Sequence, residues 1–216
     1  MKQGKKLLII AITLAMALAI AACGKAPDSG VNWDESFGII ARKEGNDKVT
    51  VILSPARSDG VTQKDLDDEK EKYGYYSAVI NSDGSVTRVV TEDYYERMVA
   101  ATRELTDYYA QALVQSGQYP NVVHAAYTQD FKASVLFTKS EHPDQTEITA
   151  MLSLMEQAKN YLAINGEDPN QETQSYIVNA ETGEYLYGMT DKKGDEIDGI
   201  IQSYLSGSKN DAPARN

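Results

Sequence analysis

The sequence predicts an α+β protein, a two-layer sandwich in which an antiparallel sheet carries helices on one face. Three observations favour this class. Short segments that alternate apolar and polar residues, and are rich in β-branched or aromatic residues, predict strands. Longer segments with apolar residues three or four positions apart predict amphipathic helices between the strands. Turns that contain Asp-Gly or Thr-Gly join neighbouring strands, which is typical of antiparallel hairpins.

The first half of the chain is expected to begin with a strand, a helix and a hairpin. Pro55 closes the first strand, and Asp83-Gly84 marks the hairpin turn. Acidic and basic residues alternate through the first helix, which predicts a solvated surface. The segments are a strand over 48–54, a helix over 62–72, and strands over 75–81 and 85–90.

A long helix is predicted over residues 91–116. Thr91 can cap its first turn, and Gly117 can close its last turn in a left-handed conformation. Apolar residues three or four positions apart predict one buried face. These residues are Tyr95, Met98, Thr102, Leu105, Tyr109 and Ala112, with Val99 and Leu113 beside them.

The second half repeats the pattern of a hairpin followed by a helix. Asp144 and Glu147 form a capping-box pattern that predicts the start of a helix, and Asn165-Gly166 ends it. The expected buried residues of that helix are Ile148, Met151, Leu152, Met155, Ala158 and Leu162. The remaining segments are strands over 121–127, 132–138, 175–180 and 184–189, and a final helix over 197–205.

The order of elements from Ser85 to Asn179 is strand, helix, strand, strand, helix, strand. This order is compatible with a ferredoxin-like βαββαβ core, in which both long helices cover one face of a single antiparallel sheet. Other two-layer α+β sandwiches share the same order, so both arrangements remain open at this point.

The N-terminus has the features of an export signal. Three basic residues precede an apolar run over 7–20, and the run ends in small residues. The apolar stretch is shorter than the roughly 18 residues that favour a membrane-spanning helix. The sequence therefore predicts a cleaved leader rather than a membrane span. The basic residues are Lys2, Lys5 and Lys6.

The end of this leader, Ile20-Ala21-Ala22-Cys23, resembles the lipobox of bacterial lipoproteins. The resemblance implies cleavage after Ala22, a diacylglycerol on the Cys23 thiol, and a position outside the cytoplasm on the cell membrane. An ordinary secreted protein with a cysteine in its leader is the alternative. Cys23 is the only cysteine in the chain, which favours the lipid interpretation over structural or redox chemistry.

The leader divides the chain into four expected parts. These are a signal peptide over 1–22, a lipidated tether over 23–32, a single α+β domain over 33–205 and a flexible tail over 206–216. Two segments of the domain, NSDGSVTRVVTEDYYERM and YPNVVHAAYTQDFKASVLFT, are similar to uncharacterised secreted lipoproteins of Gram-positive bacteria. This likeness spans roughly residues 65–138 and implies no activity.

The charge of the exported part argues against nucleic acid as a partner. The whole chain has 21 basic and 32 acidic residues. The leader holds three of the basic residues and no acidic residue, so the part after Ala22 carries 18 − 32 = −14 charges. Binding to nucleic acid or to anionic lipid headgroups requires patches of Lys and Arg. The lipid is therefore the expected membrane contact.

The sequence predicts no catalytic, metal-binding or cofactor-binding residue. The two histidines, His124 and His142, have no partner at a metal-ligand spacing. The densest acidic run, over 65–71, is interleaved with lysines and is expected to form a solvated helix face. A small cell-envelope hydrolase that uses paired carboxylates is the alternative function, because an acidic chain offers many such pairs.

Tyrosine is the unusual feature of the composition, with 14 tyrosines against three phenylalanines and one tryptophan. Adjacent pairs begin at Tyr75, Tyr94 and Tyr108, so that one ring can pack while its neighbour faces outward. Exposed tyrosines favour recognition, although tyrosines also commonly line the rim of a core. The expected function is a non-enzymatic binding module for a cell-envelope protein, peptide or glycan. The candidate interaction residues are Tyr76, Tyr94 and Tyr108.

Overall fold

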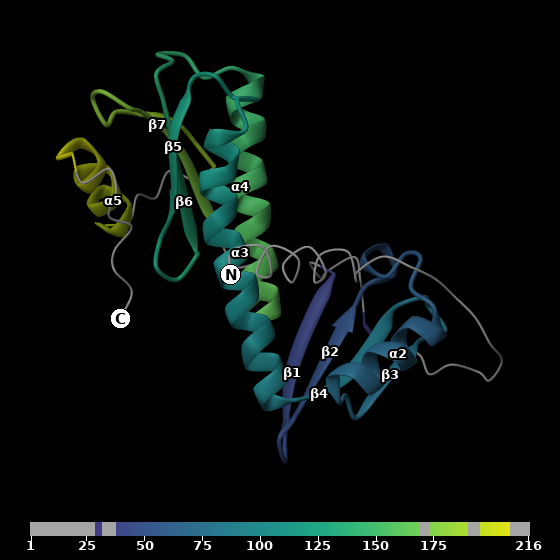
Figure 1. Cartoon of the computed structure of the whole chain (residues 1–216). Helices are drawn as coiled ribbons and strands as arrows, with labels where there is room; N and C mark the ends of the chain where they lie inside the picture. Colours follow the sequence, from purple (N-terminus) through teal and green to yellow (C-terminus); the bar gives the residue numbers. More distant parts are fainter. Residues whose placement is uncertain (1–28, 32–37, 169–172, 190–194, 208–216) are drawn as a thin grey trace, which may run out of the picture. The chain divides into compact units, whose positions relative to one another are not determined.

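The computed structural model describes residues 29–31, 38–168, 173–189 and 195–207 (Figure 1). The chain is α+β, as the sequence predicts, with strands in two separate sheets. It divides into two compact units, which differs from the single domain expected over 33–205. Unit 1 comprises Met1–Thr102 and Ala163–Asp168, and unit 2 comprises Arg103–Leu162 and Pro169–Asn216. Within the described residues, no helix is long and apolar enough to span a membrane.

Unit 1 is built on an antiparallel sheet with the strand order β1-β2-β4-β3. The edge strand β1 has no counterpart in the sequence prediction. The first part of α3 belongs to this unit and the rest to unit 2. The elements are β1 (Ile39–Gly45), β2 (Lys48–Leu53), the short 3-10 helix η2 (Pro55–Arg57), α2 (Gln63–Tyr73), β3 (Ser77–Ile80), β4 (Val86–Thr91) and α3 (Glu92–Gln115).

Both helices of unit 1 pack on the same face of its sheet. Val51 and Val90 point from the sheet into a core that also contains Leu66 of α2 and Tyr95 of α3. Leu66 is fully buried, and the Tyr95 hydroxyl donates to the Ile164 carbonyl at 2.7 Å. Unit 1 therefore matches the expected arrangement of a sheet with helices on one face.

Unit 2 contains a mixed sheet with the order β5-β6-β7-β8. β6 and β7 are parallel, because α4 carries the chain back across the sheet between them, and the other neighbours are antiparallel. The elements are β5 (Val122–Tyr127), β6 (Ala133–Thr138), α4 (Gln145–Ile164), β7 (Gln174–Asn179), β8 (Tyr185–Gly188) and α5 (Asp195–Leu205).

Helices cover both faces of the sheet in unit 2 (Figure 1). On one face, Ile197 and Ile201 of α5 pack against Val135 and Phe137 of β6, as the apolar spacing of this helix predicts. On the other face, the Tyr127 hydroxyl donates to a carbonyl of α4, at 3.2 Å. The expectation of helices on one face only is therefore wrong for unit 2.

The ferredoxin-like core does not form. The predicted order of elements is present, but β4 pairs with β2 and β3 in unit 1, whereas β5, β6 and β7 lie in the other sheet. The physical reason is that β4 finds both of its neighbours before α3 in the sequence. A ferredoxin-like arrangement would need all four strands in one sheet.

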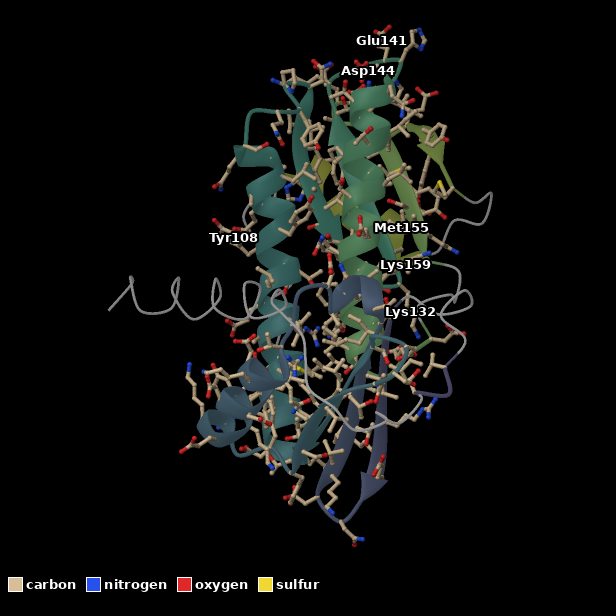
Figure 2. All side chains as sticks on the ribbon, turned by 90° about the vertical axis from the view of Figure 1, so that its right-hand side faces the viewer. Tyr108, Lys132, Glu141, Asp144, Met155 and Lys159 are labelled. Atoms are coloured by element: carbon tan, nitrogen blue, oxygen red, sulfur yellow. The ribbon has the colours of Figure 1, made fainter. Side chains whose placement is uncertain are left out.

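Local sequence signals account for the ends of the helices. Thr62 and Asp65 form a capping box at the start of α2, and Gly74 ends that helix in the left-handed conformation. Asp144 lies at the start of α4 (Figure 2). Its side chain accepts from the Glu147 N–H at 3.1 Å, and its N–H donates to Glu147 at 2.8 Å. The capping box predicted there is confirmed. Leu152, expected on the buried face of α4, is instead 37 % exposed.

Gly183, in the turn between β7 and β8, lies against α5. Its φ is +73°, and a Cβ there would be 2.8 Å from both Ile201 Cγ2 and Leu205 Cδ1. We expect Gly183→Ala to lower the free energy of unfolding by about 2–3 kcal/mol, because a left-handed alanine is strained and its methyl would displace α5. Urea denaturation followed by circular dichroism measures this loss.

Gly117 provides the matched control for Gly183. Its φ is +72°, but a Cβ there meets nothing within 4 Å. Gly117→Ala should therefore cost only about 1 kcal/mol, from backbone strain alone. Equal losses for the two variants would show that the contact with α5 contributes nothing.

Candidate functional site

The three tyrosine pairs divide between packed and more exposed rings, as the sequence predicts. Tyr75 is 7 % exposed and Tyr95 5 % exposed, whereas Tyr76 is 44 % exposed and Tyr108 57 % exposed. Tyr94 is half-buried. Of the candidate interaction residues, Tyr76 and Tyr94 belong to unit 1. Tyr108 belongs to unit 2 and projects from α3 on the side away from α4 (Figure 2).

A group of three rings in unit 1, which we call the tyrosine cluster, consists of Tyr73, Tyr75 and Tyr94. Tyr73 is the last residue of α2, the left-handed Gly74 reverses the chain, and Tyr75 leads into β3. Tyr94 lies in the first turn of α3. The ring centroids are 4.9–5.9 Å apart in all three pairs, with Tyr75 and Tyr94 in an edge-to-face arrangement. These separations are typical of favourable aromatic contacts.

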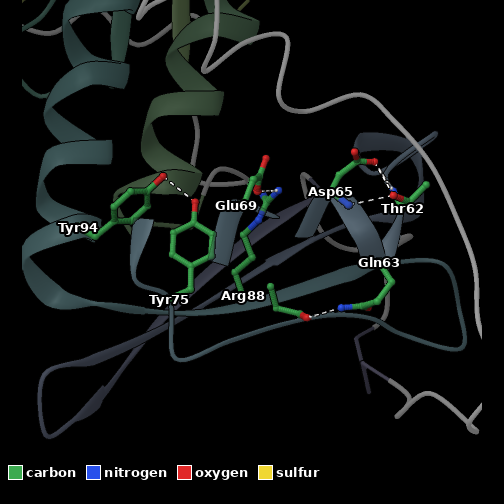
Figure 3. Close-up of polar contacts among 8 residues, drawn as sticks. Thr62, Gln63, Asp65, Glu69, Tyr75, Arg88 and Tyr94 are labelled. Carbon is green, nitrogen blue, oxygen red and sulfur yellow. Dashed lines mark hydrogen bonds and ion pairs between the residues drawn. The ribbon is translucent and has the colours of Figure 1, made fainter. Parts of the chain in front are cut away.

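The hydroxyls of the tyrosine cluster are linked by a hydrogen bond. The Tyr75 hydroxyl donates to the Tyr94 hydroxyl at 2.7 Å (Figure 3). Burial raises the pKa of Tyr75, and the hydrogen bond to Tyr94 raises it further. Burial also raises the pKa of Tyr94. Both phenols are therefore neutral at physiological pH and act as hydrogen-bonding groups rather than as nucleophiles.

A buried ion pair lies beside the tyrosine cluster. The Arg88 Nη2 donates to Glu69 Oε2 at 2.8 Å, and the two side chains are only 12 % and 17 % exposed (Figure 3). Arg88 projects from β4 on the face that α2 covers, and Glu69 reaches it from α2. The Arg88 Nε is buried and has no hydrogen-bond partner among the described residues. The pair fixes the position of α2 on the sheet next to the cluster.

Two exposed cations flank the rings of the tyrosine cluster. The Lys72 Nζ lies 4.8 Å from the Tyr73 ring centroid, and the Arg97 guanidinium lies 6.0 Å from the Tyr94 ring centroid. These distances fall within the range of cation–π contacts. Lys72 and Arg97 therefore place positive charge beside the rings, and Arg97 is also paired with Asp93 at 3.0 Å.

Tyr76 follows the tyrosine cluster in sequence and contacts the hairpin of β1 and β2. The Lys48 Nζ is 4.9 Å from its ring centroid, and its hydroxyl donates to Asp47 Oδ2 at 3.4 Å. Asp47 and Asn46 form the turn between β1 and β2, both with positive φ. Tyr76 therefore extends the aromatic surface onto the β1–β2 hairpin.

The tyrosine cluster has chemical features that a binding surface can use. The half-buried rings of Tyr73 and Tyr94 supply contact area with few torsions to restrict, whereas Tyr75 is buried beneath them. The phenol pair and the flanking cations supply polar contacts. The sequence analysis identified Tyr94 and Tyr76 but missed Tyr73, Glu69 and Arg88. The run Lys72-Tyr73-Gly74, with glycine as a helix C-cap, is the local signal that could have identified Tyr73.

The carboxylates of the described residues have structural partners where they are buried. Glu147 is 2 % exposed, and it accepts from the Thr138 hydroxyl and from the Asp144 N–H. In the acidic run over 65–71, Asp65 caps α2 and Glu69 pairs with Arg88, while Asp67 and Asp68 are exposed. Among the residues that the structure describes, no group of three His, Cys, Asp or Glu side chains is placed to hold a metal ion.

His124 lies between the sheet and α5 in unit 2, whereas His142 is exposed in the loop before α4. The His124 ring is stacked on Tyr204 of α5, with the ring centroids 5.2 Å apart, and contacts Phe137 at 5.3 Å. Burial lowers the pKa of His124 below its ordinary value of 6.5. The neutral imidazole is therefore part of the contact between α5 and the sheet.

The stability of the protein is expected to fall with acidification through the titration of His124. Below about pH 6.5 the unfolded chain binds a proton that the folded chain does not bind until a lower pH. The free energy of unfolding is therefore unaffected by His124 above about pH 6.5, and it decreases as the pH falls toward the pKa of His124 in the folded protein. Urea midpoints between pH 7.5 and 5.5 measure the decrease. It should disappear in His124→Gln and persist in His142→Gln, and the reverse pattern would contradict this assignment.

Cys23, the predicted lipid-attachment residue, and the predicted cleavage position after Ala22 lie outside the described residues. The first described residues, 29–31, begin beyond them. No family model matches the sequence, and no curated protein or solved structure is significantly similar to it.

Proposed function

We propose that the protein is a lipoprotein, held on the outer face of a bacterial membrane by a diacylglycerol on Cys23. We further propose that it is a non-enzymatic binding module. The leader with its lipobox pattern and the single cysteine at the cleavage position support the anchor. The two acyl chains of a diacylglycerol give durable attachment, whereas one chain is marginal.

The tyrosine cluster is the observation that carries the proposed binding function. The rings of Tyr73 at the end of α2, Tyr75 just before β3 and Tyr94 of α3 are in mutual contact. A hydrogen bond links the Tyr75 and Tyr94 hydroxyls, and two cations flank the rings. A rigid aromatic surface with hydroxyls binds protein, peptide or glycan groups at a low entropic cost. The ligand is therefore a cell-envelope protein, peptide or glycan that contacts unit 1.

Photo-crosslinking in intact cells tests the binding function. In one variant, a photoreactive phenylalanine derivative replaces Arg97 of α3, which flanks the tyrosine cluster. In the control variant it replaces Lys64 in the first turn of α2, at the end of that helix away from the cluster. Both side chains are well exposed. We expect a discrete adduct from the first position and none from the second. Tyr94→Ala in the same chain should remove the adduct. For a glycan, retention on isolated cell walls should show the same dependence on Tyr94.

Two results would contradict the proposal. Equal adducts from both positions would show that the tyrosine cluster is not the contact. Absence of any adduct and of any cell-wall retention would remove the binding function.

Metabolic labelling tests the anchor separately from the binding function. Cells that are fed an alkyne fatty acid should incorporate the label into the native chain and not into Cys23→Ala. Label that survives in Cys23→Ala would place the lipid on another residue.

A further inference from the structure

Different residues and turns lie at the two ends of the sheet in unit 1. At one end, which we call the N-terminal pole, Ile39, Leu53, Val86 and Ile80 stand in register beside the turn between β3 and β4. At the opposite end, which we call the tyrosine pole, lie the β1–β2 turn, the last turn of α2 and the first turn of α3. The tyrosine cluster and Tyr76 belong to the tyrosine pole.

The chain arrives at the N-terminal pole. The Ser29 hydroxyl donates to Asp83 Oδ2 at 2.5 Å, which places the first described residues beside the β3–β4 turn. Independently, β1 begins at Ile39, and the Gly38 carbonyl accepts from the Ser54 N–H at 2.8 Å at the same end of the sheet. A Cβ on Gly38 would be 2.7 Å from Ser54 Oγ, so the backbone approaches closely there.

The covalent reach from the lipid to this pole is short. Six peptide steps separate Cys23 from Ser29, and each step spans at most about 3.6 Å, which gives a limit of about 22 Å. The six-residue strands β2 and β4 span about 20 Å at about 3.4 Å per residue. The tyrosine pole is therefore about one strand length farther from Ser29 than the N-terminal pole.

We infer that unit 1 stands with its N-terminal pole toward the membrane and its tyrosine pole turned away from it. The inference rests on the proposed lipid anchor and specifies how the binding site is presented. In this orientation the site is presented to a partner that approaches from outside the cell surface.

Depth-dependent fluorescence quenching tests the orientation. The lipidated full chain is purified from cells with one added cysteine, either Ser82→Cys in the β3–β4 turn or Glu71→Cys near the end of α2. Both residues are exposed. An acylated Cys23 has no free thiol, so a thiol-reactive fluorophore labels only the added cysteine. The vesicles contain equal parts of phosphatidylcholine and phosphatidylglycerol, with a nitroxide on the phosphatidylcholine headgroup.

We expect several-fold stronger quenching at residue 82 than at residue 71. Equal quenching at both positions, or quenching at neither, would overturn the inferred orientation. Flotation of the vesicles is measured in the same samples. A chain that fails to float with the vesicles contradicts the lipid anchor itself, whereas a chain that floats without differential quenching contradicts only the orientation.

Discussion

Replacement of Glu69 by Gln is expected to lower the free energy of unfolding of unit 1 by about 3–5 kcal/mol. Arg88 and Glu69 are both more than four-fifths buried, and removal of the carboxylate charge leaves the guanidinium unpaired between α2 and the sheet. The Arg88 Nε already has no hydrogen-bond partner among the described residues. Urea denaturation of the purified protein measures the loss.

The same helix supplies a matched control for Glu69. Lys64 and Asp68 form an ion pair of 2.7 Å on α2, but their side chains are 79 % and 64 % exposed. Asp68→Asn should leave the urea midpoint nearly unchanged, because solvent screens the pair. The double variant Glu69→Leu with Arg88→Met should recover most of the stability. A small loss in Glu69→Gln would show that Arg88 is stabilised by other groups.

Replacement of Phe131 by Ala is expected to cost about 3–5 kcal/mol in unit 2. Phe131 is fully buried, and its ring centroid lies 4.5 Å from that of Tyr161 and 5.3 Å from that of Tyr127. The Arg103 guanidinium lies 5.4 Å from the Phe131 ring centroid. Removal of the ring leaves a cavity that these neighbours fill only in part.

Phe131→Gly should be less destabilising than Phe131→Ala, by about 1 kcal/mol. The φ of Phe131 is +62°, a left-handed conformation that favours glycine over alanine. At most buried positions the alanine variant is the more stable one, because glycine gives the unfolded chain more conformational freedom to lose on folding. Comparison of the two urea midpoints tests the backbone strain separately from the cavity. Greater stability of the alanine variant would contradict it.

Local patterns predicted most elements of this fold but missed β1. The segment begins with Ile39, Ile40 and Ala41, and then continues with charged residues that are exposed. Apolar alternation therefore stops halfway along the strand. Charges of this kind are typical of sheet edges, where they discourage pairing with other chains. Because only the first half of this edge strand is buried, its apolar pattern is too short to predict a strand.

The division into two sheets could not be predicted from the order of elements. Ser134 and Ser175 share a hydrogen bond of 2.7 Å across the parallel strands β6 and β7, although 41 positions separate them. Strand pairing is decided by such distant contacts, and local propensity contains no information about them. Because β1 was not predicted, it was not evident that β1, β2, β4 and β3 form a sheet of their own.

The candidate site shows the same limit. The alternation of packed and exposed tyrosines follows from strand and helix geometry, so Tyr76 and Tyr94 could be identified from adjacent pairs. The partners of the tyrosine cluster come from other elements: Glu69 and Arg88 are 19 positions apart. Only the fold brings them together beside Tyr75.

The intact mass of the native protein, isolated from cells with detergent, tests the lipid anchor most directly. We expect the mass of a chain that begins at Cys23, increased by a diacylglycerol group. A mass that corresponds to a chain that begins at Met1 or at any residue after Cys23, or one without acyl groups, would contradict the anchor and the orientation derived from it.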